Sequence, residues 1–273
     1  MSEIRSAAII GLGLIGGSLA RDLAARGVRV FSWDRDGAAV RSASEGGIAD
    51  PVMWDEPLDV VVLAVPVLAA RKLLHDIAAR AHPVRLITDV GSTKRSIVKA
   101  AEEQGIGARF VGSHPLAGDH RSGWDASRTG LFEGAPVYLA PSRSTGPDAL
   151  ELARELWTMV GAVPEVMDAA EHDRRLAWTS HLPHAAATAL ACALAEAGIA
   201  RSALGPGGRD ATRLAGSSPE MWADILVDNA DEARSALAAM SARLSAIADA
   251  VARGDRDRLR EIWAAANHWH ASP

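Results

Sequence analysis

The spacing of apolar and polar positions changes once along this chain of 273 residues, near residue 167. Before that point, short continuous apolar runs alternate with stretches of helical spacing, and glycine or proline separates them. The runs predict strands at 7–10, 28–33, 58–65, 85–90, 108–111, 135–140 and 163–167. Continuous apolar runs are typical of strands buried on both faces, and strands that alternate with helices form parallel sheets. We therefore expect a doubly wound, mostly parallel α/β sheet over residues 1–166.

After residue 167 the strand pattern disappears and only helical spacing remains. Helices are predicted over 169–200, with an interruption at Pro183, and over 219–253 and 255–268. The segment 185–197 is apolar nearly all round, which predicts burial on every side. In a small helical domain, a second subunit is the simplest cover for such a helix. The expected second domain, residues 167–273, is therefore all-α and dimerising.

A glycine-rich turn follows the first predicted strand directly. Gly11, Gly13 and Gly16 form a GxGxxG pattern that leads into a helix. Such glycines allow a tight turn, close approach of a pyrophosphate and close packing of helix on strand, and the helix N-terminus attracts the anion. The second strand ends on Asp34, an acid that can bind both ribose hydroxyls and repel a 2′-phosphate. These features predict a Rossmann dinucleotide site that favours NAD, with NADP possible because Arg35 could hold the extra phosphate.

His114 is the candidate for acid–base chemistry. It follows the apolar run 108–111, within the sequence SHPLAG at 113–118. That position is the carboxyl end of a predicted strand, where open α/β sheets bind their ligands. A neutral imidazole there can take a proton from a hydroxyl near pH 7.

The helical half holds further candidate residues. His181 and His184 are three positions apart on a predicted helix, and Asp173 shares their face. Because there is no HExxH pattern and no cysteine cluster, no metal site is expected. Arg213 follows a glycine turn, where it could either clamp a carboxylate through two hydrogen bonds or form a salt bridge at a helix start.

The composition argues against several classes of protein and structural feature. A net charge of −5 and a pI near 6.0 give no electrostatic case for nucleic acid or an anionic membrane. The single cysteine, Cys192, excludes an internal disulfide. The first apolar run is broken at once by glycines, unlike a signal peptide, and no apolar run is expected to reach the roughly 20 residues that span a bilayer. We therefore expect a soluble, cytoplasmic enzyme.

Taken together, the motifs resemble those of the prephenate/arogenate (cyclohexadienyl) dehydrogenases, the oxidative decarboxylases of the tyrosine branch. The likeness covers residues 9 to about 222. It rests, in chain order, on GLGLIGGS at 11–18, AVP at 64–66, DVGSTK at 89–94, SHPLAG at 113–118, SHLPH at 180–184, TRLA at 212–215 and SPEMW at 218–222. The resemblance implies a Rossmann domain followed by an interlocked helical dimerisation domain, and thus a homodimer.

The resemblance also implies residue roles. His114 would accept the proton of the ring hydroxyl with Ser92 as its polar neighbour, and Arg213 would clamp the carboxylate. His184 would line the same pocket, and Asp173 would support it from behind. The implied cofactor contacts are Gly11, Gly13, Leu14, Ile15, Gly16, Asp34, Arg35, Val65 and Pro66. Asp119 and His120 depart from the small hydroxyl residue and acid usual in the family, and they border the pocket for the substrate side chain.

The implied reaction is the NAD-dependent conversion of prephenate to 4-hydroxyphenylpyruvate, of arogenate to tyrosine, or of both. The departure at Asp119 and His120 leaves the side-chain preference open, and a 4-amino-4-deoxyprephenate dehydrogenase of an antibiotic pathway is an alternative. An NAD(P)-binding redox sensor or a β-hydroxyacid or imine reductase is a different class. A sensor needs no acid–base group such as His114, and hydroxyacid dehydrogenases generally use a helix-borne lysine, whereas residues 167–273 contain none.

Overall fold

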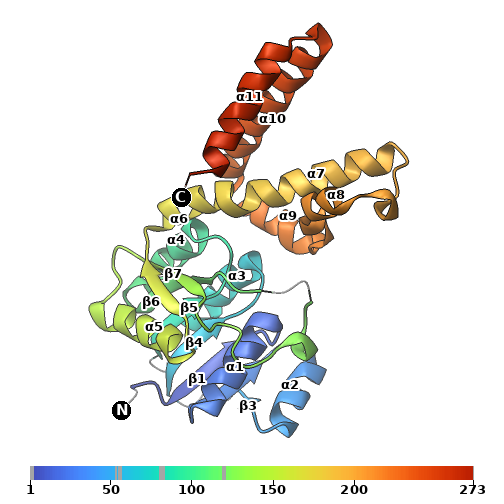
Figure 1. The fold of residues 1–273 in the computed structure, drawn as a ribbon. Helices are drawn as coiled ribbons and strands as arrows, with labels where there is room; N and C mark the ends of the chain where they lie inside the picture. Colours follow the sequence, from blue (N-terminus) through green and yellow to red (C-terminus); the bar gives the residue numbers. More distant parts are fainter. Residues whose placement is uncertain (1–2, 53, 55–56, 80–83, 119–120, 273) are drawn as a thin grey trace. The chain divides into compact units, whose positions relative to one another are not determined.

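The chain, which Figure 1 colours along the sequence from blue to red, folds into two units. The computed structural model describes residues 3–272 apart from 53, 55–56, 80–83 and 119–120. The first unit comprises Met1–Leu176 with Gly216–Asn229, and the second comprises Ala177–Ala215 with Ala230–Pro273.

One sheet of eight strands forms the centre of the first unit. The strands are β1 Ser6–Ile10, β2 Arg29–Trp33, β3 Asp50–Pro51, β4 Leu58–Leu63, β5 Val84–Asp89, β6 Phe110–Pro115, β7 Pro136–Pro141 and β8 Val163–Val166. Their order across the sheet is β3-β2-β1-β4-β5-β6-β7-β8. Neighbouring strands are parallel except β6 and β7, which are antiparallel. The expectation of a mostly parallel sheet is confirmed.

Helices cover both faces of this sheet. The helices of the first unit are α1 Leu14–Ala25, α2 Gly37–Glu45, α3 Val67–Ala78, α4 Arg95–Glu103, α5 Pro147–Met159, α6 Ala169–Leu176 and α9 Pro219–Asp228. One apolar cluster joins the sheet to α1, α2 and α5, and a second joins it to α3 and α4. In β1, Ile9 belongs to the first cluster and Ile10 to the second, because successive side chains of a strand point to opposite faces. The central strands β1 and β4 are largely apolar because both of their faces are buried, whereas the edge strands β3 and β8 are mostly exposed.

The strand expected at 108–111 extends further than its apolar residues indicate. The residues Gly107–Arg109 form a short 3-10 turn, and β6 continues to Pro115. Ser113 and His114 remain in the strand because they pair with Leu139 and Tyr138 of β7. His114 therefore lies at the carboxyl end of the strand itself, not on the loop that follows it.

The helix expected over 219–253 is two helices. α9 ends at Asp228, and α10 begins at Ala230. Between them, the buried Asn229 donates from Nδ2 to the Asp173 carbonyl oxygen at 2.8 Å and accepts at Oδ1 from the Arg95 guanidinium at 3.0 Å. Asparagine side chains that bind neighbouring groups in this way favour helix ends over helix interiors.

The second unit is helical. It contains a π-helical turn at Ala177–His181, then α7 Leu182–Glu196, a 3-10 turn at Arg201–Ala203, α8 Pro206–Ala211, the start of a 3-10 turn at Arg213–Gly216, α10 Ala230–Arg253 and α11 Arg256–His270. Pro183 lies in the first turn of α7, but the residues before it are already helical, since the π-helical turn directly precedes α7 and His181 has a φ of −65° and a ψ of −46°. A proline within a helical run removes a backbone donor and crowds the preceding turn, which favours a local departure from regular α-helix. The interruption expected at Pro183 is therefore the junction between the π-helical turn and α7.

Apolar side chains of this unit stay exposed within one chain. Among the residues of α7, all of which the structure describes, only Ala187 is buried, and Leu190 is 41% exposed. The single chain therefore does not bury this helix, and its expected cover by a second subunit stays a prediction. α10 has 24 residues, and a window of 18 residues within it has a mean hydropathy of 1.2, so by length and composition it could cross a membrane, although charged residues such as Arg243 and Asp249 interrupt its apolar sequence. Length and composition alone are weak evidence for a span, because a helix covered by another protein surface shares them.

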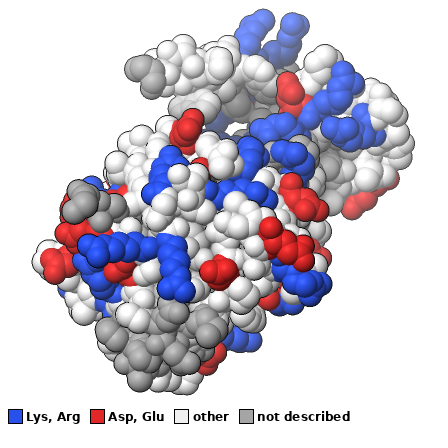
Figure 2. Space-filling model, turned by 90° about the horizontal axis from the view of Figure 1, so that it is seen from below, with Lys and Arg blue, Asp and Glu red and all other residues white. Residues whose placement is uncertain are grey.

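Charges of both signs lie on the surface. On the face that Figure 2 presents, Lys and Arg side chains lie beside Asp and Glu side chains over much of the described surface. A nucleic-acid-binding protein typically has a broad patch of positively charged side chains on its surface. On this face, positive and negative side chains are mixed and do not form such a patch, which agrees with the net charge of −5.

Candidate active site

The glycine loop between β1 and α1 is held against the neighbouring strand β4. Gly11 has a φ of +105°, and a Cβ there would lie 2.2 Å from the Ala64 carbonyl oxygen. A Cβ on Gly16 would lie 1.9 Å from the Gly11 carbonyl oxygen. Only glycine fits at these two positions. A Cβ on Gly13, by contrast, would meet nothing within 4 Å, so the loop leaves open space beside this residue.

The first turn of α1 follows Gly13 without a capping side chain. Gly13 is the N-cap residue and provides no side-chain hydrogen bond to the first amides of the helix. Uncapped amides at a helix N-terminus bind anions such as a pyrophosphate. The open side of Gly13 and the uncapped amides together fit the diphosphate of a dinucleotide.

Asp34 lies beside this loop, directly after β2. Its Oδ2 accepts from the Leu12 amide at 2.5 Å, and its Oδ1 accepts from the Asp36 amide at 2.8 Å. These contacts fix an ionisable acceptor at the position where dinucleotide-binding sheets contact the ribose. Arg35, the next residue, is exposed. The donor set of the loop and Asp34 therefore fits NAD.

The remaining predicted cofactor and hydroxyl contacts lie on the same edge of the sheet. Leu14 and Ile15 lie in the first turn of α1. Val65 and Pro66 follow β4 directly, and Pro66 is the N-cap of α3. The half-buried Ser92 lies in the loop between β5 and α4. The carboxyl ends of parallel neighbouring strands thus bring these segments to one edge.

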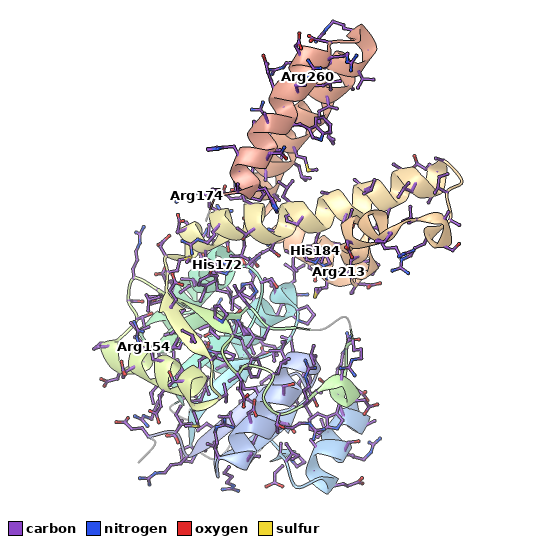
Figure 3. All side chains as sticks on the ribbon, in the orientation of Figure 1. Arg154, His172, Arg174, His184, Arg213 and Arg260 are labelled. Carbon is purple, nitrogen blue, oxygen red and sulfur yellow. The ribbon has the colours of Figure 1, made fainter. Side chains whose placement is uncertain are left out.

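His114 takes part in a chain of hydrogen bonds that sequence reasoning did not identify. Its Nδ1 lies 2.9 Å from Nε2 of His172, and Nδ1 of His172 lies 2.8 Å from Oδ1 of Asp173. The two imidazole rings meet edge to face, with centroids 5.1 Å apart. His172, which Figure 3 labels, is completely buried and comes from α6, so the chain joins the sheet to that helix.

The N-terminus of α4 anchors the far end of this chain. Asp173 accepts from the Lys94 amide at Oδ1, at 2.7 Å, and from the Arg95 amide at Oδ2, at 2.9 Å. Burial by itself raises the pKa of Asp173, but the hydrogen bonds from His172 and these two amides hold that pKa below its ordinary value. Burial and the nearby Lys94 ammonium lower the pKa of His172 more than Asp173 raises it. The carboxyl group is therefore ionised and His172 is neutral near pH 7.

A buried ion pair lies close to the histidine chain. Lys94 and Asp89 are 0% and 1% exposed and are hydrogen-bonded to each other. Asp89 also accepts from the amides of Gly91, at 2.8 Å, and Ser113, at 3.2 Å. Burial raises the pKa of the Asp89 carboxyl, and the Lys94 ammonium opposes that rise. The pair ties the ends of β5 and β6 to the start of α4.

His184 and Arg213 both lie in the second unit, where Figure 3 labels them. Nδ1 of His184 lies 3.0 Å from the Ser180 carbonyl oxygen, so Nδ1–H donates and Nε2 carries the lone pair. Burial, with a smaller contribution from the positive Arg213, lowers the pKa of His184. Arg213 is exposed, whereas His181, which shares a predicted face with His184, is buried.

The structure thus connects His114 to Asp173 and shows what joins them. His172 and Lys94 are the residues that sequence reasoning missed. The available signals were weak: His172 directly precedes Asp173, and Lys94 ends the DVGSTK motif. Two predicted site residues, Asp119 and His120, lie outside the described residues.

Comparison with known proteins gives matches along most of the chain. A model described as "Prephenate dehydrogenase, nucleotide-binding domain" matches residues 19–166, and one described as "Prephenate dehydrogenase, dimerization domain" matches residues 168–265. The cyclohexadienyl dehydrogenase of Zymomonas mobilis is 35% identical, over 96% of this chain and 93% of that protein. The prephenate dehydrogenase of Bacillus subtilis is 36% identical, over 85% of this chain but 66% of that longer protein.

A solved structure agrees with these matches. The prephenate dehydrogenase of A. aeolicus, in complex with hydroxyphenyl propionate and NAD⁺, has a TM-score of 0.90 and 30% identity, and the match covers 98% of each chain. The Rossmann fold, the helical second domain and NAD as the cofactor, all expected from the sequence, are confirmed by these findings. Since the two family models cover more than half of the chain and relatives align over most of it, the chain belongs to the prephenate dehydrogenase family.

Proposed function

We propose that the protein catalyses the NAD-dependent oxidative decarboxylation of prephenate, of arogenate or of both, in tyrosine biosynthesis. The observation that carries this proposal is the hydrogen-bonded chain His114–His172–Asp173 at the end of β6. An imidazole anchored in this way can accept a proton from a ring hydroxyl near neutral pH. The family and the names of the relatives support the substrate class.

The reaction requires a hydride transfer, a proton transfer and the loss of carbon dioxide. When bound, NAD⁺ supplies the acceptor for the hydride of the carbinol carbon. His114 takes the hydroxyl proton as the carbon–oxygen double bond forms. The bond to the ring carboxylate then breaks, and its electron pair stays in the ring, which becomes an aromatic phenolate. His114 returns the proton to the phenolate and is ready for the next turnover.

Substrate binding is assigned to five residues, each with its own proposed role. Arg213 is the proposed partner of the ring carboxylate, because a guanidinium holds a carboxylate through two parallel hydrogen bonds. His184 supplies a further polar contact through Nε2, and Ser92 is the polar neighbour of the hydroxyl. Asp119 and His120, which lie outside the described residues, are assigned to the substrate side chain on the family resemblance, and the choice between a keto acid and an amino acid stays open.

The proposed cofactor contacts divide among the parts of the dinucleotide. Asp34 binds the ribose hydroxyls and favours NAD over NADP, and Arg35 lies beside the ribose. The other contacts are assigned to Gly11, Gly13, Leu14, Ile15, Gly16, Val65 and Pro66. The open side of Gly13 and the uncapped first turn of α1 support the diphosphate position.

The same proposal covers domains and assembly. Residues 1–166 are assigned to the NAD-binding domain and residues 167–273 to substrate binding and dimerisation, which the ranges of the family models support. Homodimerisation through the helical domain is supported by the exposed apolar side chains of α7 and α10. We assign the protein to the cytoplasm, and its single cysteine gives no internal disulfide of the kind that oxidising compartments favour.

An assay of the purified protein tests the proposal. Prephenate, arogenate and 4-amino-4-deoxyprephenate are each offered with NAD and with NADP, and formation of reduced cofactor is followed at 340 nm. We expect turnover of prephenate or arogenate with NAD, and a His114→Asn variant with about 10²- to 10⁴-fold lower turnover and unchanged NAD binding.

The other outcomes separate the alternatives. Turnover of the amino analogue alone would assign the protein to an antibiotic pathway. Turnover of only a hydroxy acid that cannot become aromatic, or NAD binding without any turnover, would contradict the proposal and favour a hydroxyacid reductase or a redox sensor.

A further inference from the structure

His172 is completely buried and hydrogen-bonded to His114 on one side and to Asp173 on the other, and the proposed function does not say which atom of His114 this contact leaves ready to react. We infer that His172 is a positioning residue: it fixes the tautomer of His114, so that Nε2 of His114 is the atom that takes the substrate proton. The inference rests on the proposed function, because it names the reacting atom of the same site.

The direction of each hydrogen bond follows from Asp173. An ionised carboxylate only accepts, and the amides of Lys94 and Arg95, at 2.7 and 2.9 Å, require it to do so. Nδ1 of His172, at 2.8 Å, must therefore donate to Asp173.

A neutral imidazole has one proton, so Nε2 of His172 then carries a lone pair. Nδ1 of His114, at 2.9 Å, must donate to that lone pair. The single proton of neutral His114 is thus on Nδ1, and its lone pair is on Nε2. The opposite tautomer of His114 would place two lone pairs against each other in a buried contact.

The groups around His172 keep it neutral. Asp173 is on its own helix, Lys94 and Asp89 act on it from the start of α4 and the end of β5, and His114 lies on β6. The Tyr138 ring of β7 meets the His172 ring edge to face, with centroids 5.7 Å apart. Burial and Lys94 lower the pKa of His172 more than Asp173 and Asp89 raise it.

This arrangement serves both directions of proton transfer. When Nε2 of His114 takes the hydroxyl proton, the ring becomes an imidazolium that still donates from Nδ1 to His172. Asp173 stabilises the new positive charge through the His172 ring. When the proton returns to the phenolate, the same tautomer is restored, so no ring rotation is needed between turnovers.

Two substitutions at one position test the inference. In His172→Gln, the side-chain oxygen can accept from Nδ1 of His114 while the amide donates to Asp173. In His172→Leu, neither bond can form. We expect the Leu variant to lose about 10²-fold in kcat with the dissociation constant of NAD within about twofold of the parent, and the Gln variant to stay within about tenfold of the parent kcat.

A measurement without substrate separates this inference from the proposed function. In protein with ¹⁵N-labelled histidines, two-bond ¹H–¹⁵N spectra at pH 7.5 distinguish the two neutral tautomers. We expect the His114 signals, assigned by their absence from His114→Asn, to show the Nδ1–H form in the parent and in His172→Gln. In folded His172→Leu, we expect a mixture of forms.

The opposite tautomer of His114 in the parent would overturn the inference, even if the enzyme is active. Equal losses of kcat in the Gln and Leu variants would also overturn it, since a purely structural role of His172 predicts that result. Absence of activity in the parent, with the Nδ1–H form observed, would instead refute the proposed function alone.

Discussion

Replacing Asp173 with Asn measures how strongly the buried carboxylate holds the first unit together. Oδ1 accepts from the Lys94 amide and from His172, and Oδ2 accepts from the Arg95 amide. In the Asn variant, the side-chain oxygen is expected to stay at the Oδ1 position, where it accepts from the Lys94 amide and from His172. The side-chain amino group then points toward Arg95. The backbone amide of the half-buried Arg95, and its guanidinium Nε at 3.4 Å, then face another donor in place of Oδ2, which costs about 1–3 kcal/mol. The other two hydrogen bonds lose the negative charge, at about 1 kcal/mol each.

The expected loss is therefore about 3–5 kcal/mol in the free energy of unfolding, within the range for removing one partner of a buried charged network. For a domain of this size, that corresponds to a fall of roughly 10 °C in the midpoint of thermal unfolding. Urea unfolding at pH 7.5 and fixed protein concentration, followed by tryptophan fluorescence, measures it, because Trp157 is completely buried in the same unit.

Asp168→Asn is the matched control on the same helix. Asp168 is exposed and accepts at Oδ1 from the amides of Ala170, at 2.8 Å, and Glu171, at 3.1 Å. Asparagine caps helices about as well as aspartate, so the control is expected to change the stability by less than about 0.5 kcal/mol. A loss below about 1 kcal/mol in Asp173→Asn, or equal losses in the two variants, would refute the reasoning about the buried carboxylate.

Three further predictions concern pH, cofactor choice and substrate binding. The pKa of His172 is lower in the folded protein than the value of about 6.5 in the unfolded chain. The contribution of His172 to the free energy of unfolding is therefore complete above about pH 6.5 and is lost as the pH falls below that value. The free energy of unfolding should therefore fall between pH 7 and pH 5, and less steeply in His172→Gln; equal slopes in urea titrations would contradict this. Asp34→Ser should lower kcat/KM with NAD about tenfold and raise it with NADP, because Arg35 can then meet the 2′-phosphate; a parent enzyme that already prefers NADP would remove the role of Asp34. Arg213→Ala should raise the KM of the cyclohexadienyl substrate about 10²-fold and leave the NAD dissociation constant unchanged in fluorescence titrations, and a normal KM would exclude the carboxylate clamp.

Local sequence patterns were sufficient to predict the sheet and the nucleotide loop. The apolar runs gave the strands because burial on both faces leaves no polar alternation, and the two core clusters confirm that reason. Gly16 was readable from the sequence because its short contact is with Gly11 in the same loop, and Gly11 because its φ of +105° is a local property of the turn. The position of His114 near a strand end was readable because the apolar run 108–111 comes shortly before it, although pairing with β7 extended β6 beyond its apolar residues.

The contacts of the candidate active site depend on residues far apart in the chain. His114 and His172 are 58 positions apart, and Lys94 and Asp173 are 79 positions apart. The apolar pattern within one helix or strand does not predict which of its side chains will contact a second element packed against it. The break at Asn229 is of the same kind, because the groups its side chain binds belong to α4 and α6.

The exposure of α7 shows a second limit. Its composition predicted a covered helix, and the single chain leaves it largely exposed. The apolar composition of a helix predicts that its surface is removed from water, but it does not predict which other surface covers it. The sequence by itself thus determined most of the elements, the nucleotide loop and the family. Tertiary structure decided the hydrogen-bonded order of His114, His172 and Asp173, because that order depends on how α4, α6 and β6 pack against one another.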